Sequence, residues 1–274
     1  MDMMNPLKIW VAVAVTILLL VGCHQEQHAN LNVVVSTTMI KSIVDQIGGS
    51  RLEVTAIVPG GMCPGHFDIS PSQMTRITTA DLFLYQGWER WAQDLARSNK
   101  DFSSAKLVGI EGNWLIPDIH LEAIDRIKDI LIAADSRGRS IYEDNAKAYA
   151  DSVRREGHIL KDRFKTYAGT RVICSKLQAD FLTWLGLDVV ATFDRQEDLT
   201  PRQLSTLISL GRDQNVKVVV DNLQSGLRVG SQIARELGAM HAVLSNFPLE
   251  GSYLETLRQD ADELEAKLKE VQSN

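Results

Sequence analysis

The sequence lacks the features on which several classes of protein depend. Its 29 lysine and arginine residues are outnumbered by 35 aspartate and glutamate residues, the net charge is −6, and no run of basic residues occurs. A nucleic-acid binder needs a basic face, so this class is excluded. Three cysteines in 274 residues are too few for a disulfide-stabilised scaffold. No P-loop, nucleophile elbow or dinucleotide-binding glycine motif occurs, which excludes the enzymes that use those motifs.

The amino terminus is the most apolar part of the chain. Residues 10–22 are apolar apart from Thr16, a run shorter than the roughly 20 residues that cross a bilayer. The run therefore predicts a signal peptide over 1–22. It ends in Leu-Val-Gly-Cys, which resembles a bacterial lipobox, so we expect a lipid on Cys23 and a polar tether over 23–30. The protein is then extracytoplasmic and lipid-anchored to a bacterial membrane, in the periplasm or at the cell surface.

Beyond residue 30, short β-branched runs alternate with amphipathic segments. This alternation predicts an α/β fold with mostly parallel sheets covered on both faces. The segment 140–168 holds one glycine and no proline, which predicts a single long, rigid helix. We expect it to join two similar lobes, over 31–139 and 169–274. The predicted strands are 32–36, 52–58, 81–85, 106–110, 170–175, 189–193, 216–220 and 242–244.

Several short motifs in this arrangement occur together in one known family. They are Val-Val-Val-Ser-Thr at 33–37, Ile-Gly-Gly at 47–49, Val-Pro at 58–59, Pro-Ser at 71–72, Ala-Asp-Leu at 80–82, Tyr142 with Asn145 and Tyr149, and the segment 234–239. With them, the chain resembles the zinc- and manganese-binding solute-binding lipoproteins of ABC importers (cluster A-I) over nearly its whole mature length. The resemblance implies two lobes, a metal ion held between them, and an ABC permease as partner.

In that family, four side chains hold the metal. The resemblance puts His66 at the first histidine position and His120, on a loop ahead of the helical stretch, at the second. The second lobe departs from the pattern, because Ser175 stands where a histidine or glutamate belongs and Asn246 where an aspartate belongs. Serine and asparagine are weak ligands, so the family's metal cannot simply be transferred to this chain.

Two cysteines can replace the missing ligands. Cys63 lies three residues before His66, and Cys174 directly precedes Ser175. Cys63, His66, His120 and Cys174 would form a tetrahedral site with two sulfur and two nitrogen donors. Such a site suits zinc, or copper(I), better than manganese. A Cys63–Cys174 disulfide, a buried structural Cys174 and a degenerate site remain as alternatives. Asp221, at the end of a predicted strand, is a weaker candidate ligand or cap.

The sequence therefore predicts a binding protein that is not an enzyme. We expect it, as a monomer, to capture a transition-metal ion in the cleft between the lobes, zinc before copper(I) or manganese, and to deliver it to an ABC permease. The rivals are a receptor for a metal chelate or small organic ligand on the same fold, and an adhesin-like lipoprotein with a vestigial site. A zinc hydrolase would need a general base beside an open coordination position, and no motif supplies one.

Overall fold

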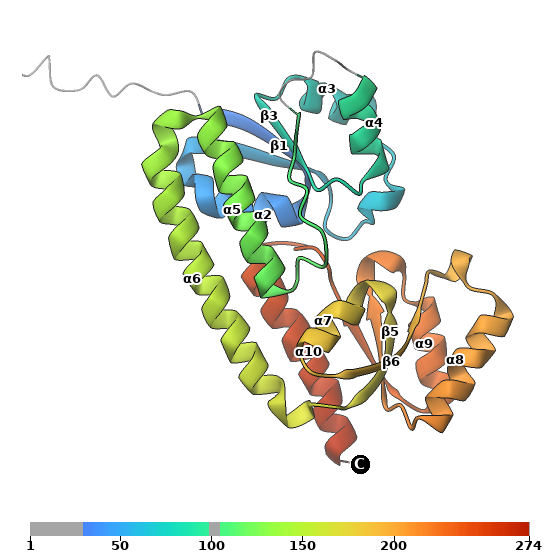
Figure 1. Cartoon of the computed structure of the whole chain (residues 1–274). Coiled ribbons are helices and arrows are strands. Elements are labelled where there is room, and N and C mark those ends of the chain that lie inside the picture. Colours follow the sequence, from blue (N-terminus) through green and yellow to red (C-terminus); the bar gives the residue numbers. More distant parts are fainter. Residues whose placement is uncertain (1–29, 99–104, 274) are drawn as a thin grey trace, which may run out of the picture. The chain divides into compact units, whose positions relative to one another are not determined.

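The computed structural model describes residues 30–98 and 105–273, so the predicted signal peptide and the lipidated Cys23 lie outside the described residues. Leu31–Asn274 forms one compact unit. It contains two four-stranded sheets, with strand orders β2-β1-β3-β4 and β6-β5-β7-β8, and every strand pair in both is parallel (Figure 1). The prediction of an α/β fold with two similar, parallel lobes is confirmed. None of the described helices combines the length and apolar character needed to span a membrane.

The first sheet is buried on both faces around the apolar residues Val33, Val34 and Val35 of its inner strand β1. Val33 and Val35 of β1 pack toward one hydrophobic cluster, and Val34 packs toward another with Ile77 and Ala92. This alternation follows from the two-residue period of a strand. The strands are β1 (Leu31–Thr37), β2 (Leu52–Val58), β3 (Leu82–Tyr85) and β4 (Ala105–Leu107), and the associated helices are α2 (Thr38–Gly48), α3 (Pro71–Thr78) and α4 (Arg90–Ser98).

The second sheet repeats this design. Val172 and Cys174 of β5 face one cluster, and Ile173 between them faces the other. The strands are β5 (Arg171–Ser175), β6 (Asp188–Phe193), β7 (Val218–Asn222) and β8 (Met240–Leu244). The helices are α7 (Ala179–Trp184), α8 (Pro201–Asp213), α9 (Arg228–Leu237) and α10 (Tyr253–Ser273).

Two long helices, α5 (Pro117–Ala134) and α6 (Arg139–Phe164), lie between the sheets in sequence. Helix α6 packs on α2 and α5, which belong to the first half of the unit (31–139), and on α10, which belongs to the second half (169–274). Figure 1 shows α6 running alongside α5 and α10. One continuous hydrophobic cluster includes Val35 of the first sheet, Val153 of α6 and Val220 of the second sheet. The two halves therefore share a core, which ties them together more firmly than a flexible linker would.

Local signals set most of the helix starts. Thr37, Ser70 and Thr200 each accept a hydrogen bond from a backbone N–H in the first turn of the helix that follows. Helix α5 begins at Pro117, a favourable first position because proline has no N–H to satisfy there. The prediction that His120 lies on a loop ahead of the helix is therefore wrong, since this residue lies within α5.

Candidate functional site

Side chains from both halves of the unit line one pocket of about 500 Å³. Much of its wall comes from segments that follow the carboxyl ends of strands, the usual place for ligands on open parallel sheets. The first half contributes Met39, Cys63, Pro64, Gly65, His66, Gln86, Trp88, Gly112, Asn113 and Trp114, and the second half contributes Lys176, Leu177, Asp180, Arg195, Asn222, Gln224, Asn246 and Phe247.

Cys63 and His66 form a pair in the wall of this pocket. Cys63 Sγ lies 3.6 Å from His66 Nδ1, and the His66 N–H donates to the Cys63 carbonyl at 3.2 Å. The turn between them is held by Trp91, whose Nε1 donates to the carbonyl of Pro64 at 3.1 Å. A tetrahedral zinc ion with bonds of ~2.3 Å to sulfur and ~2.0 Å to nitrogen separates two such donors by about 3.5 Å. The pair therefore has the spacing of two ligands of one ion.

His120 lies in the shared core and does not line the pocket. Its side chain is fully buried, its Nε2 is 2.9 Å from the Tyr149 hydroxyl, and its ring stacks on Tyr253 with centroids 3.6 Å apart. Burial lowers the pKa of His120 to about 3, and the backbone of Trp114 acts in the opposite direction. The imidazole is thus neutral and held by packing at neutral pH, and the structure does not bring it together with His66.

Cys174 is also part of the shared core. It is fully buried in β5, and burial raises the pKa of its thiol to about 12, with the charge of Asp180 adding to the shift. Both Cys63 and Cys174 are free, so no disulfide joins them in this structure. A thiol in such surroundings behaves as a small hydrophobic side chain. Ser175, which ends β5, is buried as well and does not line the pocket.

Asp221 and Asn246 have different surroundings. Asp221 is buried in β7, where its Oδ2 lies 2.7 Å from His241 Nε2 and its carboxylate packs so closely on Gly230 that a methyl group there would overlap it. Asn246 does line the pocket. Its Oδ1 accepts from Gln178 Nε2 at 2.8 Å, and its Nδ2 donates to the Leu177 carbonyl at 3.3 Å. Asp221 is therefore outside the pocket and Asn246 is part of its wall.

The four predicted metal ligands do not converge. Among the described residues, no group of three or more histidine, cysteine, aspartate or glutamate side chains is placed to hold a metal ion. Of the predicted set, the pocket wall holds Cys63 and His66, which is half of a tetrahedral site.

Sequence reasoning missed the amide and cationic side chains of the pocket. The amides are Gln86, Asn113, Asn222 and Gln224, and the cations are Lys176 and Arg195. A usable signal was present, because Gln86 directly follows β3 and Asn222 ends β7. Polar residues at the carboxyl ends of parallel strands are placed to meet a ligand, whether or not they resemble metal ligands.

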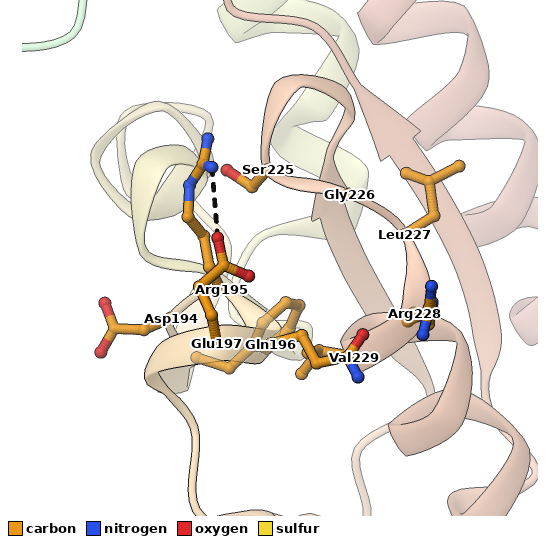
Figure 2. Close-up of a pocket in the computed structure, with 10 residues that line it drawn as sticks. Asp194, Arg195, Gln196, Glu197, Ser225, Gly226, Leu227, Arg228 and Val229 are labelled. Carbon is orange, nitrogen blue, oxygen red and sulfur yellow. Dashed lines mark hydrogen bonds and ion pairs between the residues drawn. The ribbon is translucent and has the colours of Figure 1, made fainter. Parts of the chain in front are cut away.

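Arg195 also borders a second, smaller hollow of about 210 Å³ in the second half. This hollow is lined by 193–197 and 225–229, and Figure 2 shows the contact between Arg195 and Glu197, with Nη1 and Oε1 3.5 Å apart. The other guanidinium nitrogen donates to the Gln224 carbonyl at 2.9 Å. These two contacts hold the guanidinium of Arg195, a residue that lines both the hollow and the main pocket.

Hydrogen bonds made by residues of the main pocket join the two halves of the unit. Gln224 Nε2 donates to the Gly60 carbonyl at 2.6 Å, and Asn113 Nδ2 donates to the Leu177 carbonyl at 3.0 Å. Gly60 lies so close to Pro248 that a Cβ atom would come within 2.0 Å of the Pro248 carbonyl oxygen. Direct backbone contact therefore joins the two halves beside Gln224 of the pocket wall.

Comparison with known proteins gives a consistent result. The sequence model of one family, described as "Zinc-uptake complex component A periplasmic", matches residues 33–267. The manganese-binding lipoprotein MntA of Halalkalibacterium halodurans is 25% identical over 214 residues, covering 71% of this chain and 71% of the relative. The iron-binding protein YfeA of Yersinia pestis is 24% identical over 233 residues, covering 76% of this chain and 75% of the relative.

Solved structures share the fold. A crystal structure of ZnuA superposes with a TM-score of 0.77 at 20% sequence identity, covering 87% of this chain and 99% of that one. The laminin-binding protein Lmb of Streptococcus agalactiae gives a TM-score of 0.77 at 21% identity, covering 87% and 100%. The names of the two relatives specify manganese binding and iron binding, and the family description specifies zinc uptake, so all three concern a metal and differ in which one.

Proposed function

The chain belongs to the family of periplasmic zinc-uptake component A proteins, and from this premise we propose that it captures transition-metal cargo and delivers it to an ABC permease. Its relatives include substrate-binding lipoproteins of manganese ABC transporters. The cargo that fits this chain is zinc before copper(I) or manganese. The chain acts as a binding protein without a catalytic step, as a monomer, anchored outside the cytoplasm by a lipid on Cys23.

The observation that carries the choice of metal is the Cys63–His66 pair in the pocket wall. Its separation of 3.6 Å suits two ligands of one tetrahedral ion. A thiolate and an imidazole favour zinc or copper(I), whereas manganese prefers carboxylate and water oxygens. When the ion binds, the Cys63 thiol gives up its proton to water, so metal binding releases acid.

The test uses the whole chain, purified in detergent without oxygen or chelators. We expect about one equivalent of zinc by inductively coupled plasma mass spectrometry. Cys63→Ser and His66→Ala should each weaken zinc affinity at least tenfold, about 1.4 kcal/mol, in competition with a fluorescent zinc chelator.

The matched controls are Cys174→Ala, in the core, and His158→Ala, on the exposed face of α6. Both should bind zinc within twofold of the unchanged chain. Equal affinity in the Cys63 and His66 variants, or a protein that takes up neither zinc nor copper(I), would contradict the proposal.

A further inference from the structure

The pocket is larger than a bare ion needs and offers too few ligands to enclose one. Its volume of about 500 Å³ falls in the range of ~300–1,000 Å³ typical of small-molecule sites. Cys63 and His66 fill two positions of a tetrahedral ion, which leaves two for groups that the pocket wall does not bring together. Something else must complete the coordination sphere, and the pocket has room for more than water.

Asn222 in the pocket wall has an unused hydrogen-bonding atom. The residue is fully buried, its Oδ1 accepts from Ser225 Oγ at 3.0 Å, and its Nδ2 has no hydrogen-bond partner. Turning the amide over exchanges the two atoms but still leaves one of them unpaired. A buried polar atom without a partner costs free energy that a ligand group can recover. This side chain therefore points to a polar organic ligand.

The rest of the wall suits an anionic organic molecule. Lys176 and Arg195 place two cationic groups in the pocket wall, against the single carboxylate of Asp180 there. Glu197, which does not line the pocket, also contacts Arg195, with Oε1 3.5 Å from Nη1. Trp88, whose side chain is 49% exposed, comes from the first half and lies 6.4 Å, between ring centroids, from Phe247 of the second half. Two aromatic faces and two cations favour a small, flat or compact molecule that carries a carboxylate.

Resting on the proposed function, we propose that the cargo is the metal ion together with a small carboxylate-bearing chelator. Cys63 Sγ and His66 Nδ1 supply two ligands, and the chelator supplies the others. Its carboxylate is met by Lys176 and Arg195, its polar groups by the amide of Asn222, and its apolar surface by Trp88. The complex, rather than the ion, then decides which solute the protein selects.

The experiment compares zinc alone with 1:1 complexes of zinc with L-histidine, L-cysteine or citrate, by isothermal titration calorimetry on the whole chain in detergent. At least one complex should bind tenfold or more tightly than zinc alone. Trp88→Ala and Asn222→Ala should each weaken the binding of that complex at least fivefold more than they weaken the binding of zinc alone. Ile159→Ala, an exposed apolar residue on α6, is the matched control for Trp88→Ala, and thermal melting verifies that the Asn222 variant folds.

The outcomes separate this inference from the function on which it rests. If zinc alone binds as tightly as every complex and still depends on Cys63 and His66, the chelator is refuted and zinc capture stands. If Trp88→Ala and Asn222→Ala weaken both forms equally, the chelator is refuted as well. If a chelator binds without metal and is insensitive to Cys63→Ser, both proposals fail, because the protein is then a receptor for an organic solute.

Discussion

The chain carries two cysteine and histidine sets of the same chemistry in opposite surroundings. Cys63 and His66 lie on a short turn in the wall of the pocket, whereas Cys174 and His120 are fully buried in the core that the two halves share. The first set lines a pocket that an ion can enter, and the second is held neutral by burial. Residue type alone therefore does not identify a ligand; the element that carries it and the face it occupies do.

The largest expected difference between the two sets is thiol reactivity. Cys63 is partly exposed, and Cys174 is fully buried with a pKa raised by burial to about 12. Cys174 can react only when the surrounding structure opens locally. We therefore expect iodoacetamide to modify Cys63 about a thousandfold faster than Cys174, or more, at pH 8. Peptide mass spectrometry at timed intervals measures both rates. Comparable rates in the folded protein would contradict the burial of Cys174.

The second difference concerns acid stability. The pKa of His120 is lowered to about 3 in the folded chain, below its usual value of about 6.5. As the pH falls, His120 is protonated in the unfolded chain before it is protonated in the folded chain. Its contribution to the free energy of unfolding is therefore fully present above pH 6.5 and is lost as the pH falls toward 3. Between pH 6 and pH 4 this single group should lower the free energy of unfolding by about 2.5 kcal/mol.

Urea unfolding at the two pH values measures that loss. His120→Gln keeps a hydrogen-bonding group near Tyr149 but does not ionise. From pH 6 to pH 4, the free energy of unfolding of this variant should therefore fall less than that of the unchanged chain, by the amount that His120 contributes. Asp260, whose pKa burial raises, changes stability in the opposite direction, but it is present in both proteins and cancels from the comparison. The same pH dependence in both proteins would show that His120 is not held neutral.

The smallest expected difference is the effect of a conservative substitution. Cys174→Ser places a hydroxyl in an apolar core and should lower the free energy of unfolding by about 2 kcal/mol. Cys63→Ser, on a partly exposed turn, should change it by less than about 0.5 kcal/mol. Urea denaturation of the metal-free variants at pH 7 measures both values. A larger loss for Cys63→Ser would reverse the structural assignment of the two thiols.

Much of the fold was predictable from local patterns. The predicted strand segments overlap each of the eight described strands, and Thr37, Ser70 and Thr200 are residue types that favour helix starts. The place of His120 was harder to see, because a motif-based assignment weighs its position along the chain and not its helical face. Its spacing to Ala123, Ile124 and Ile127 puts it on the apolar stripe of α5, and this period indicates burial.

The ligand set was less predictable because it depends on contacts between distant segments. Cys174 alternates with Ile173 along a strand buried on both faces, so no strand period marks one side as the cleft side. The amide of Asn222 has no metal-ligand character and is placed in the pocket only when β7 folds beside β5. Only Cys63 and His66, three residues apart on one turn, are close enough in sequence for their spacing to predict their proximity.

The shared core also has a consequence for the kinetics of cargo exchange. Swinging the two halves apart would expose apolar surface around α6, whereas parting the rim needs only local movement near Gly60 and Pro248. Under the proposed function, we therefore expect the residence time of the cargo to depend on the mobility of these few residues and on the Gln224 contact to Gly60. A permease that accelerates release would then act on this short stretch of backbone. A substitution at Gly60, which does not line the pocket, should change how long the cargo stays more than what the pocket recognises.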